Sequence, residues 1–447
     1  EKMYQGTLGW PDIWAQHNEH RLVFPKLIML GLARLTHWDI RYELAVSLLL
    51  AVGLFAILAR QVGRGKEWLV AVLSVMVFSM SQWQNWFLGW QLQEFLNVLA
   101  VVAGFCVLGN ERREWGRFIS AIALGVVATF SFGNGLAYWP IGLAMLLSKA
   151  GFDDPGCVER CDCPSSAKTT HWVFVGAWTA VSVLTMALYF HGYKTPPNHP
   201  STRLVLERPI EYLQYVFAYL GSPIINYSVT GAAIAGVIGL VILGLALIVL
   251  YPPQSPRMRG EGLEGTPRFQ GENRSGEGNL QTHLPNEGDS AEEAALGLPP
   301  ACGGTEGGKV NGVAPYLAMA AYSVAAAVVT GVGRVGFGGE QALSSRYITI
   351  AQLMWVALAV LVYEVLSARR RRRTMVVLAV IFMGALTVNA LYGTLKWTER
   401  YQFKLPAQAE LVSGDNEDLL QRLYPDPKVV LERREILRKY ELSVFGK

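Results

Sequence analysis

Long apolar segments without a charged side chain constrain the fold of this chain more than any other feature. Residues 45–59 and 232–251 contain no Asp, Glu, Lys, Arg or His. A helix rises 1.5 Å per residue, so about 20 apolar residues span the roughly 30 Å of bilayer hydrocarbon. Across the 447 residues, 51% are hydrophobic and only 17% are charged, which excludes an ordinary water-soluble enzyme. The sequence therefore predicts an integral membrane protein.

We predict an all-α fold, a polytopic transmembrane bundle in which about ten helices are visible. The second, fourth and fifth segments are short, and Pro140 interrupts the fifth. The predicted spans lie near 41–60, 67–82, 91–109, 117–133, 135–149, 171–190, 228–250, 313–333, 346–366 and 374–394.

Basic residues in short loops predict the orientation, because they stay on the cytoplasmic side. The strongest marker is the arginine run 369–373, and strict alternation places the other short basic loops on the same side. Since the first segment then lies outside, we expect one further helix before Glu1, giving about eleven. The predicted external segments are 1–40, 83–90, 131–135, 191–227, 334–345 and the tail from Lys396.

The chain divides where its composition changes. Residues 252–312 are rich in Gly, Pro, Glu and Asn and poor in aromatic residues, which predicts a disordered cytoplasmic linker. Residues 22–38 are amphipathic, and the tail shows a helical pattern over 431–440 after Pro425 and Pro427. The expected units are an external loop with an amphipathic helix (1–40), a seven-helix membrane region (41–250), the linker (251–312), a three-helix membrane region (313–394) and an external helical tail (395–447).

Charge and cysteine content exclude two further classes. The net charge is only +4, and the basic residues follow topology, so no nucleic-acid partner is expected. The five cysteines form no disulfide framework. Cys157, Cys161 and Cys163 have a metal-like spacing, but three thiols in a reducing cytoplasmic loop do not predict a metal site.

The first external loop carries the densest set of chemically active side chains. Asp12, His17, Glu19, His20 and Arg21 could together supply a general base and an anion contact. The alternative is a solvated loop that tryptophans anchor in the interfacial belt. The histidine pair lacks the third and fourth ligands of a zinc site, so no metal ligand is assigned and a divalent cation is left open.

A second candidate region is 82–94, where tryptophans and amides alternate at a helix start. Indole faces stack on the C–H faces of sugars while amides bond their hydroxyl groups, which makes Trp86, Trp90 and Gln91 candidates. An aromatic belt explains the tryptophans equally well, but it does not explain the polar residues. Glu94 is a carboxylate just inside a membrane helix, where a charge is costly and by default functional. At a helix end, however, it could simply reach water.

Two glycine-containing loops complete the candidate site. The turn 131–135 (SFGNG) could bring Asn134 to a substrate, or it could simply connect two helices. The loop 331–347 carries Glu340 between Arg334 and Arg346, two potential phosphate clamps. Both arginines could instead snorkel to the interface, yet positive charge on the outer side opposes the topology bias.

The segments HNEHR (17–21), SFGNG (131–135) and GFGGEQALSSRY (336–347), with the predicted topology, resemble bacterial members of the C-type superfold of integral-membrane glycosyltransferases. This superfold includes protein mannosyltransferases and the aminoarabinose transferase. The resemblance implies a first external loop with amphipathic helices, an acidic catalytic residue and a polyprenyl-phosphate sugar donor. The usual acidic pair directly after the first helix is absent from this sequence, so Asp12 and Glu19 match by position rather than by motif.

The resemblance implies hexosyl or pentosyl transfer on the outer side of a bacterial cytoplasmic membrane. Asp12 or Glu19 deprotonates an acceptor hydroxyl, Arg334 and Arg346 hold the lipid phosphate, and the remaining candidates contact substrate. A transporter or flippase of a lipid-linked saccharide needs the same polar groups without a base. A non-catalytic polytopic membrane protein is the third alternative. The fold alone does not decide among these functions or give the oligomeric state.

Overall fold

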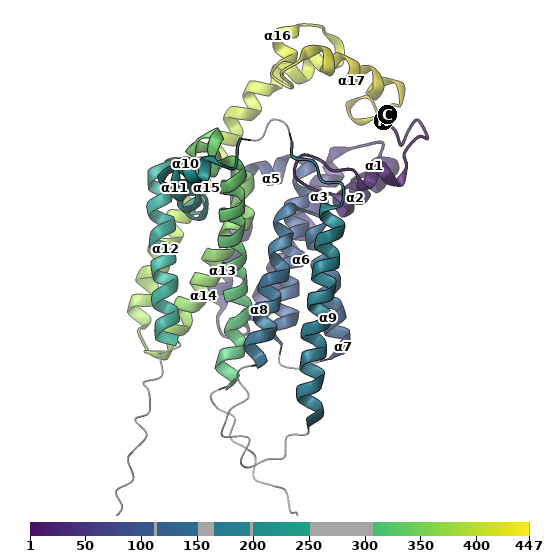
Figure 1. Ribbon diagram of the computed structural model, residues 1–447. Helices are drawn as coiled ribbons and strands as arrows, with labels where there is room; N and C mark the ends of the chain where they lie inside the picture. The colour runs from purple at the N-terminus through teal and green to yellow at the C-terminus, as the bar shows by residue number, and fades with distance from the viewer. Residues whose placement is uncertain (111–113, 151–164, 197–199, 251–306, 447) are drawn as a thin grey trace, which may run out of the picture.

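The computed structural model describes residues 1–110, 114–150, 165–196, 200–250 and 307–446. The predicted all-α fold is confirmed: apart from one isolated β-bridge, the regular structure in these ranges is helical. The long helices run side by side as a bundle (Figure 1). The predicted spans correspond to α3 (Ile40–Val62), α4 (Glu67–Val77), α6 (Leu92–Gly109), α7 (Trp115–Thr129), α8 (Tyr138–Ala150), α9 (Ser165–Phe190), α12 (Val229–Leu250), α13 (Gly307–Arg334), α14 (Ile348–Ala368) and α15 (Arg372–Ser413).

Within the described ranges, seven of these helices are long and apolar enough to cross a bilayer. The exceptions are α4, α7 and α8, which contain 11, 15 and 13 residues and correspond to the segments that the sequence marks as short. At 1.5 Å per residue, none of them reaches the roughly 30 Å of the hydrocarbon layer. These shorter helices instead help to build the interior, since α4 buries Leu69, Leu73 and Met76.

The helices differ in how much of their surface is covered. α6 and α14 lie inside the bundle, where residues such as Phe95, Val98 and Leu353 are fully buried. By contrast, α12 exposes Ile234 and Leu245, which are 56% and 57% accessible. Exposed apolar side chains on a membrane helix face lipid, so the outer helices provide the lipid-contacting surface.

One half-buried helix lies in a segment that the sequence assigned to an external loop. α11 (Pro209–Gly221) begins at a proline and packs along α12 and α13. Gly221 and Gly236 permit the close approach to α12, because a Cβ at Gly221 would overlap the Ala232 carbonyl. The predicted loop 191–227 is therefore partly a packed helix.

Most of the predicted external segments gather at one end of the bundle. The amphipathic stretch forms α2 (Val23–Thr36), which lies there with α1 (Trp10–Trp14), α5 (Trp83–Phe87) and α10 (Leu204–Glu207) (Figure 1). This end carries the candidate site described below.

The tail continues from the bundle at one end and contacts the start of the chain at the other. α15 continues to Ser413, well past the predicted boundary at 394, and is followed by α16 (Glu417–Leu420) and α17 (Pro427–Lys439). Arg434 of α17 pairs with Asp415 at 2.7 Å, and Tyr440 packs on Tyr4 with ring centroids 5.5 Å apart. The tail thus arches back to the start of the chain (Figure 1).

Two predictions fall wholly or mostly outside the described ranges. The cysteine motif at Cys157, Cys161 and Cys163 is one of them. The linker 251–312 is the other, except that α13 already begins at Gly307, before the predicted boundary.

Candidate functional site

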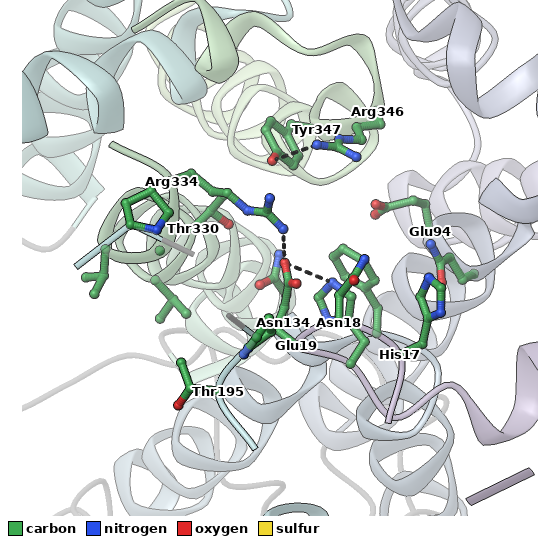
Figure 2. Close-up of a pocket in the computed structure, with 18 of the residues that line it drawn as sticks. His17, Asn18, Glu19, Glu94, Asn134, Thr195, Thr330, Arg334, Arg346 and Tyr347 are labelled. Carbon is green, nitrogen blue, oxygen red and sulfur yellow. Dashed lines mark hydrogen bonds and ion pairs between the residues drawn. The ribbon is translucent and has the colours of Figure 1, made fainter. Parts of the chain in front are cut away.

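A pocket of about 390 Å³ lies at the end of the bundle that carries α1 and α2. Its walls come from the first loop, the start of α6, the turn before α8, the segment after α9 and both flanks of the loop between α13 and α14. It brings together nine candidates from these distant parts of the sequence: His17, Glu19, His20, Trp90, Gln91, Glu94, Asn134, Arg334 and Arg346 (Figure 2).

The first wall is a tight backbone turn. The His17 N–H donates to the His20 carbonyl at 2.8 Å, and the His20 N–H donates to the His17 carbonyl at 2.9 Å. Asn18 takes a left-handed conformation with φ of 49°, which asparagine tolerates better than most residues. The turn therefore presents Glu19 between two imidazoles.

Glu19 is held at its backbone and at its carboxylate. The Tyr189 hydroxyl on α9 donates to the Glu19 carbonyl at 2.9 Å. The carboxylate forms an ion pair with Arg334 from the end of α13, and His20 Nε2 lies 3.5 Å from Glu19 Oε1 (Figure 2). These contacts place a carboxylate, a guanidinium and an imidazole around one point of the pocket.

The SFGNG turn fixes the orientation of His20. The Gly133 N–H donates to His20 Nδ1 at 3.1 Å, and the ring packs on Phe132 with centroids 4.2 Å apart. Burial lowers the pKa of His20 to about 4 against the opposing effect of Glu19. The ring is therefore neutral near pH 7, and because Nδ1 is an acceptor, its proton resides on Nε2, which faces Glu19.

The carboxylate itself stays ionised. Burial acts to raise the pKa of Glu19, but His20 and the Arg334 guanidinium outweigh burial and bring that pKa below its usual value. With His20 neutral near pH 7, we attribute most of this lowering to Arg334. An ionised carboxylate can accept a proton, which is the first requirement for a general base.

The opposite wall is the start of α6. Glu94 is 1% exposed and points into the pocket (Figure 2). Gln91 and Gln93 are buried and also line the pocket. Trp90 lies just before them and packs on the His17 ring with centroids 4.8 Å apart. The wall therefore combines a carboxylate, two amides and an indole.

A hydrogen bond to its backbone carbonyl fixes the position of Arg346. Asn85 on α5 donates to the Arg346 carbonyl at 2.9 Å and to the Thr349 hydroxyl at 2.6 Å. The guanidinium lies over the Tyr347 ring, 5.1 Å from its centroid. No ion pair found within the described ranges includes Arg346, whereas Arg334 is engaged by Glu19.

Four candidates lie outside the pocket lining. Asp12 pairs with Lys2 and accepts the Gly9 N–H at 3.0 Å. The buried Arg21 donates to three carbonyls, of Tyr189, Trp14 and His191, and so ties the first loop to the end of α9. The Trp86 indole donates to the Ser79 carbonyl at 2.9 Å, and Glu340 is exposed in the short helix Gly339–Leu343.

The pocket also contains residues that sequence reasoning did not select. Gln93 belongs to the same polar run as Gln91 and Glu94, and Tyr347 follows Arg346 directly. The sequence could have indicated these two residues only because they lie next to selected candidates in the chain. Thr330, Tyr193 and Thr195 carry no comparable signal, because they reach the pocket only through the packing of α9 and α13. The polar and aromatic residues in this group are Asn18, Gln93, Phe132, Tyr193, Thr195, Thr202, Thr330 and Tyr347.

The described residues contain no group of three or more His, Cys, Asp or Glu side chains suited to hold a metal ion. No family model, curated protein or solved structure matches this chain. Its helices and their apolar surfaces nevertheless define its class: it is a polytopic helical membrane protein.

Proposed function

We propose that this protein is a glycosyltransferase that moves a sugar from a polyprenyl-phosphate donor to an acceptor on the outer side of a bacterial cytoplasmic membrane. The observation that carries the proposal is the Glu19 carboxylate inside the pocket, held by Arg334 and faced by His20. The predicted topology places this pocket on the extracytoplasmic side.

The proposed reaction uses the carboxylate as a base. Glu19 accepts the proton of an acceptor hydroxyl, the hydroxyl oxygen bonds to the anomeric carbon, and the bond from that carbon to the phosphate oxygen breaks. The lipid phosphate leaves with its electron pair and carries negative charge. A guanidinium stabilises that charge well, because its planar fork matches the phosphate oxygens.

Burial supports the assignment to Glu19 rather than Asp12. Glu19 lines the pocket, whereas Asp12 lies outside the lining and is already paired with Lys2. A pocket that excludes water strengthens each electrostatic contact of the reacting groups. The two carboxylates therefore form a matched pair for an experiment.

Glu19→Gln removes the proton acceptor while keeping the shape of the side chain. We expect turnover of a polyprenyl-phosphate sugar to fall by at least about 100-fold, with donor binding nearly unchanged. Asp12→Asn is the control and should keep near wild-type turnover. Normal turnover by the Glu19 variant would exclude the transferase mechanism, and transport of the intact lipid-linked sugar without transfer would favour a flippase.

A further inference from the structure

A carboxyl group and a guanidinium in the pocket have polar atoms without partners. Glu94 Oε2 and Arg346 Nε are both buried, and neither forms a hydrogen bond with another described residue. The salt bridges of the described residues include neither side chain. Burying a polar atom without a partner is costly, so these atoms are expected to be satisfied by a bound ligand.

The unpartnered atoms on the α6 side are all acceptors. Gln91 Oε1 and Gln93 Oε1 are buried without a hydrogen-bond partner, as is Glu94 Oε2. The three residues are 7%, 5% and 1% exposed, and all of them line the pocket. A ligand that satisfies this wall must present several hydrogen-bond donors to it.

On the other side of the pocket, Arg346 needs a hydrogen-bond acceptor instead of donors. A guanidinium only donates, so its Nε requires an acceptor, and an anionic acceptor forms the stronger bond. Arg334 is less available, because Glu19 already occupies it. A ligand that fits both walls therefore carries an anionic group at one end and hydroxyl groups at the other.

We propose that Gln91, Gln93 and Glu94 form a subsite for the hydroxyl groups of a neutral sugar whose anomeric phosphate binds Arg346. The proposal rests on the proposed function for the nature of the donor, and it adds which wall binds the sugar, which arginine binds the phosphate, and which sugars are excluded. Trp90 stands at the edge of the subsite, where an indole face can stack on the C–H face of a sugar ring.

The subsite should reject acidic sugars. A hexuronic acid would bring a second carboxyl group against Glu94 in a buried setting, where two neighbouring carboxyl groups cannot both ionise. A neutral hexose instead donates hydroxyl hydrogens to the carboxylate and to both amides. The sign of the charge on the sugar is therefore the property that this wall discriminates.

The test measures the part of the affinity that the sugar contributes. Purified full-length protein in nanodiscs is titrated with a polyprenyl phosphate and with the same lipid carrying glucose. For Glu94→Gln we expect binding of the glucosyl lipid to weaken by at least about tenfold, because the amide replaces a carboxyl oxygen, which can accept a hydroxyl hydrogen, with an NH2 group, which can only donate. Binding of the bare phosphate should be unchanged. Arg346→Lys should weaken both, since an ammonium lacks the guanidinium fork.

Glu43→Gln is the matched control. Glu43 is a buried carboxylate on α3 near the same end of the bundle, but it does not line the pocket. Its variant should bind both lipids as the wild type does. If Glu94→Gln weakened both lipids equally, or neither, the sugar subsite would be wrong.

A second measurement needs no variant and so does not depend on the folding of one. The wild-type protein should bind the glucosyl lipid at least about tenfold more tightly than the glucuronosyl lipid. Equal binding of the two lipids would overturn the subsite. The two proposals also fail separately: normal turnover by Glu19→Gln together with a selective effect of Glu94→Gln would leave a sugar-lipid binding site without transferase chemistry.

Discussion

At the scale of single residues, one backbone N–H determines the state of His20. Gly133 donates to Nδ1, so this nitrogen cannot also carry a proton, and the ring packs on Phe132. A Cβ at position 133 would lie only 2.7 Å from Nδ1, which explains why a glycine serves there. The glycine of the turn therefore acts on the chemistry of the pocket through a histidine.

The buried neutral state of His20 makes stability depend on pH. Burial holds the pKa of His20 at about 4 in the folded protein, whereas an unfolded histidine titrates near 6.5. Between these values the unfolded state binds more protons, so stability should fall as the pH drops from about 6.5 to 4, by on the order of 3 kcal/mol in all. Thermal unfolding in detergent at both ends of this range measures the effect.

His20→Asn should reduce this pH dependence. His37→Asn is its control, because His37 is exposed, lies outside the pocket and adopts the left-handed conformation that asparagine tolerates. An unchanged dependence of the unfolding temperature on pH in the His20 variant would show that other groups cause it.

Site residues could be selected from the sequence only by type and neighbourhood. Glu19 and Asp12 were equivalent on that basis, and Arg21 was indistinguishable from Arg334. Tertiary partners hold Asp12 and Arg21 outside the pocket lining. Asp12 pairs with Lys2, and Arg21 donates to the carbonyl of Tyr189, 168 residues away. Sequence spacing carries no information about such partners.

At the scale of elements, a single asparagine joins α15 to the turn between α11 and α12. The buried Asn389 side chain donates to the Ser222 and Pro223 carbonyls at 3.0 and 2.9 Å and accepts the Asn226 N–H at 2.8 Å. Three backbone groups in the protein interior thus depend on one side chain. None of these buried groups can form a replacement hydrogen bond with bulk water when that side chain is lost.

Asn389→Ala should therefore destabilise the protein by about 3 kcal/mol or more, since it leaves buried polar groups unsatisfied. A lower unfolding temperature in detergent would show this loss. Thr387→Ala, two residues away on α15, should change stability by less than about 0.5 kcal/mol, because Thr387 is exposed and its hydroxyl bonds only within its own helix. Equal shifts in the two variants would contradict the role of Asn389 as a link.

Hydropathy predicted where the membrane helices lie but not where every helix begins or ends. The segment of α11 was missed because Glu211 and its tyrosines interrupt the apolar pattern, although Tyr215 and Tyr219 are fully buried by packing. α15 extends past the predicted boundary because Lys396, Glu399 and Arg400 end an apolar run without ending a helix. Hydropathy indicates where a helix leaves the membrane. It does not indicate where the helix ends, because backbone hydrogen bonds can continue into water.

At the scale of the whole molecule, the pocket exists because five separate segments meet at one end of the bundle. The pocket lining itself shows that all five lie at the same end, and the basic loops predict that this end faces the exterior. The functional proposals depend on this orientation, because a polyprenyl-phosphate donor on the wrong side of the membrane could not reach the pocket.

Cysteine labelling in intact cells tests the orientation directly. In a background that lacks the five native cysteines, Asn18→Cys and Gly338→Cys should react with a thiol reagent that does not cross the cytoplasmic membrane, whereas Gly65→Cys and Arg371→Cys should react only after the membrane is permeabilised. All four positions are exposed, so burial does not decide their reactivity. The reverse pattern would place the pocket in the cytoplasm, where Glu19 and Arg346 could serve only a donor and an acceptor on that side.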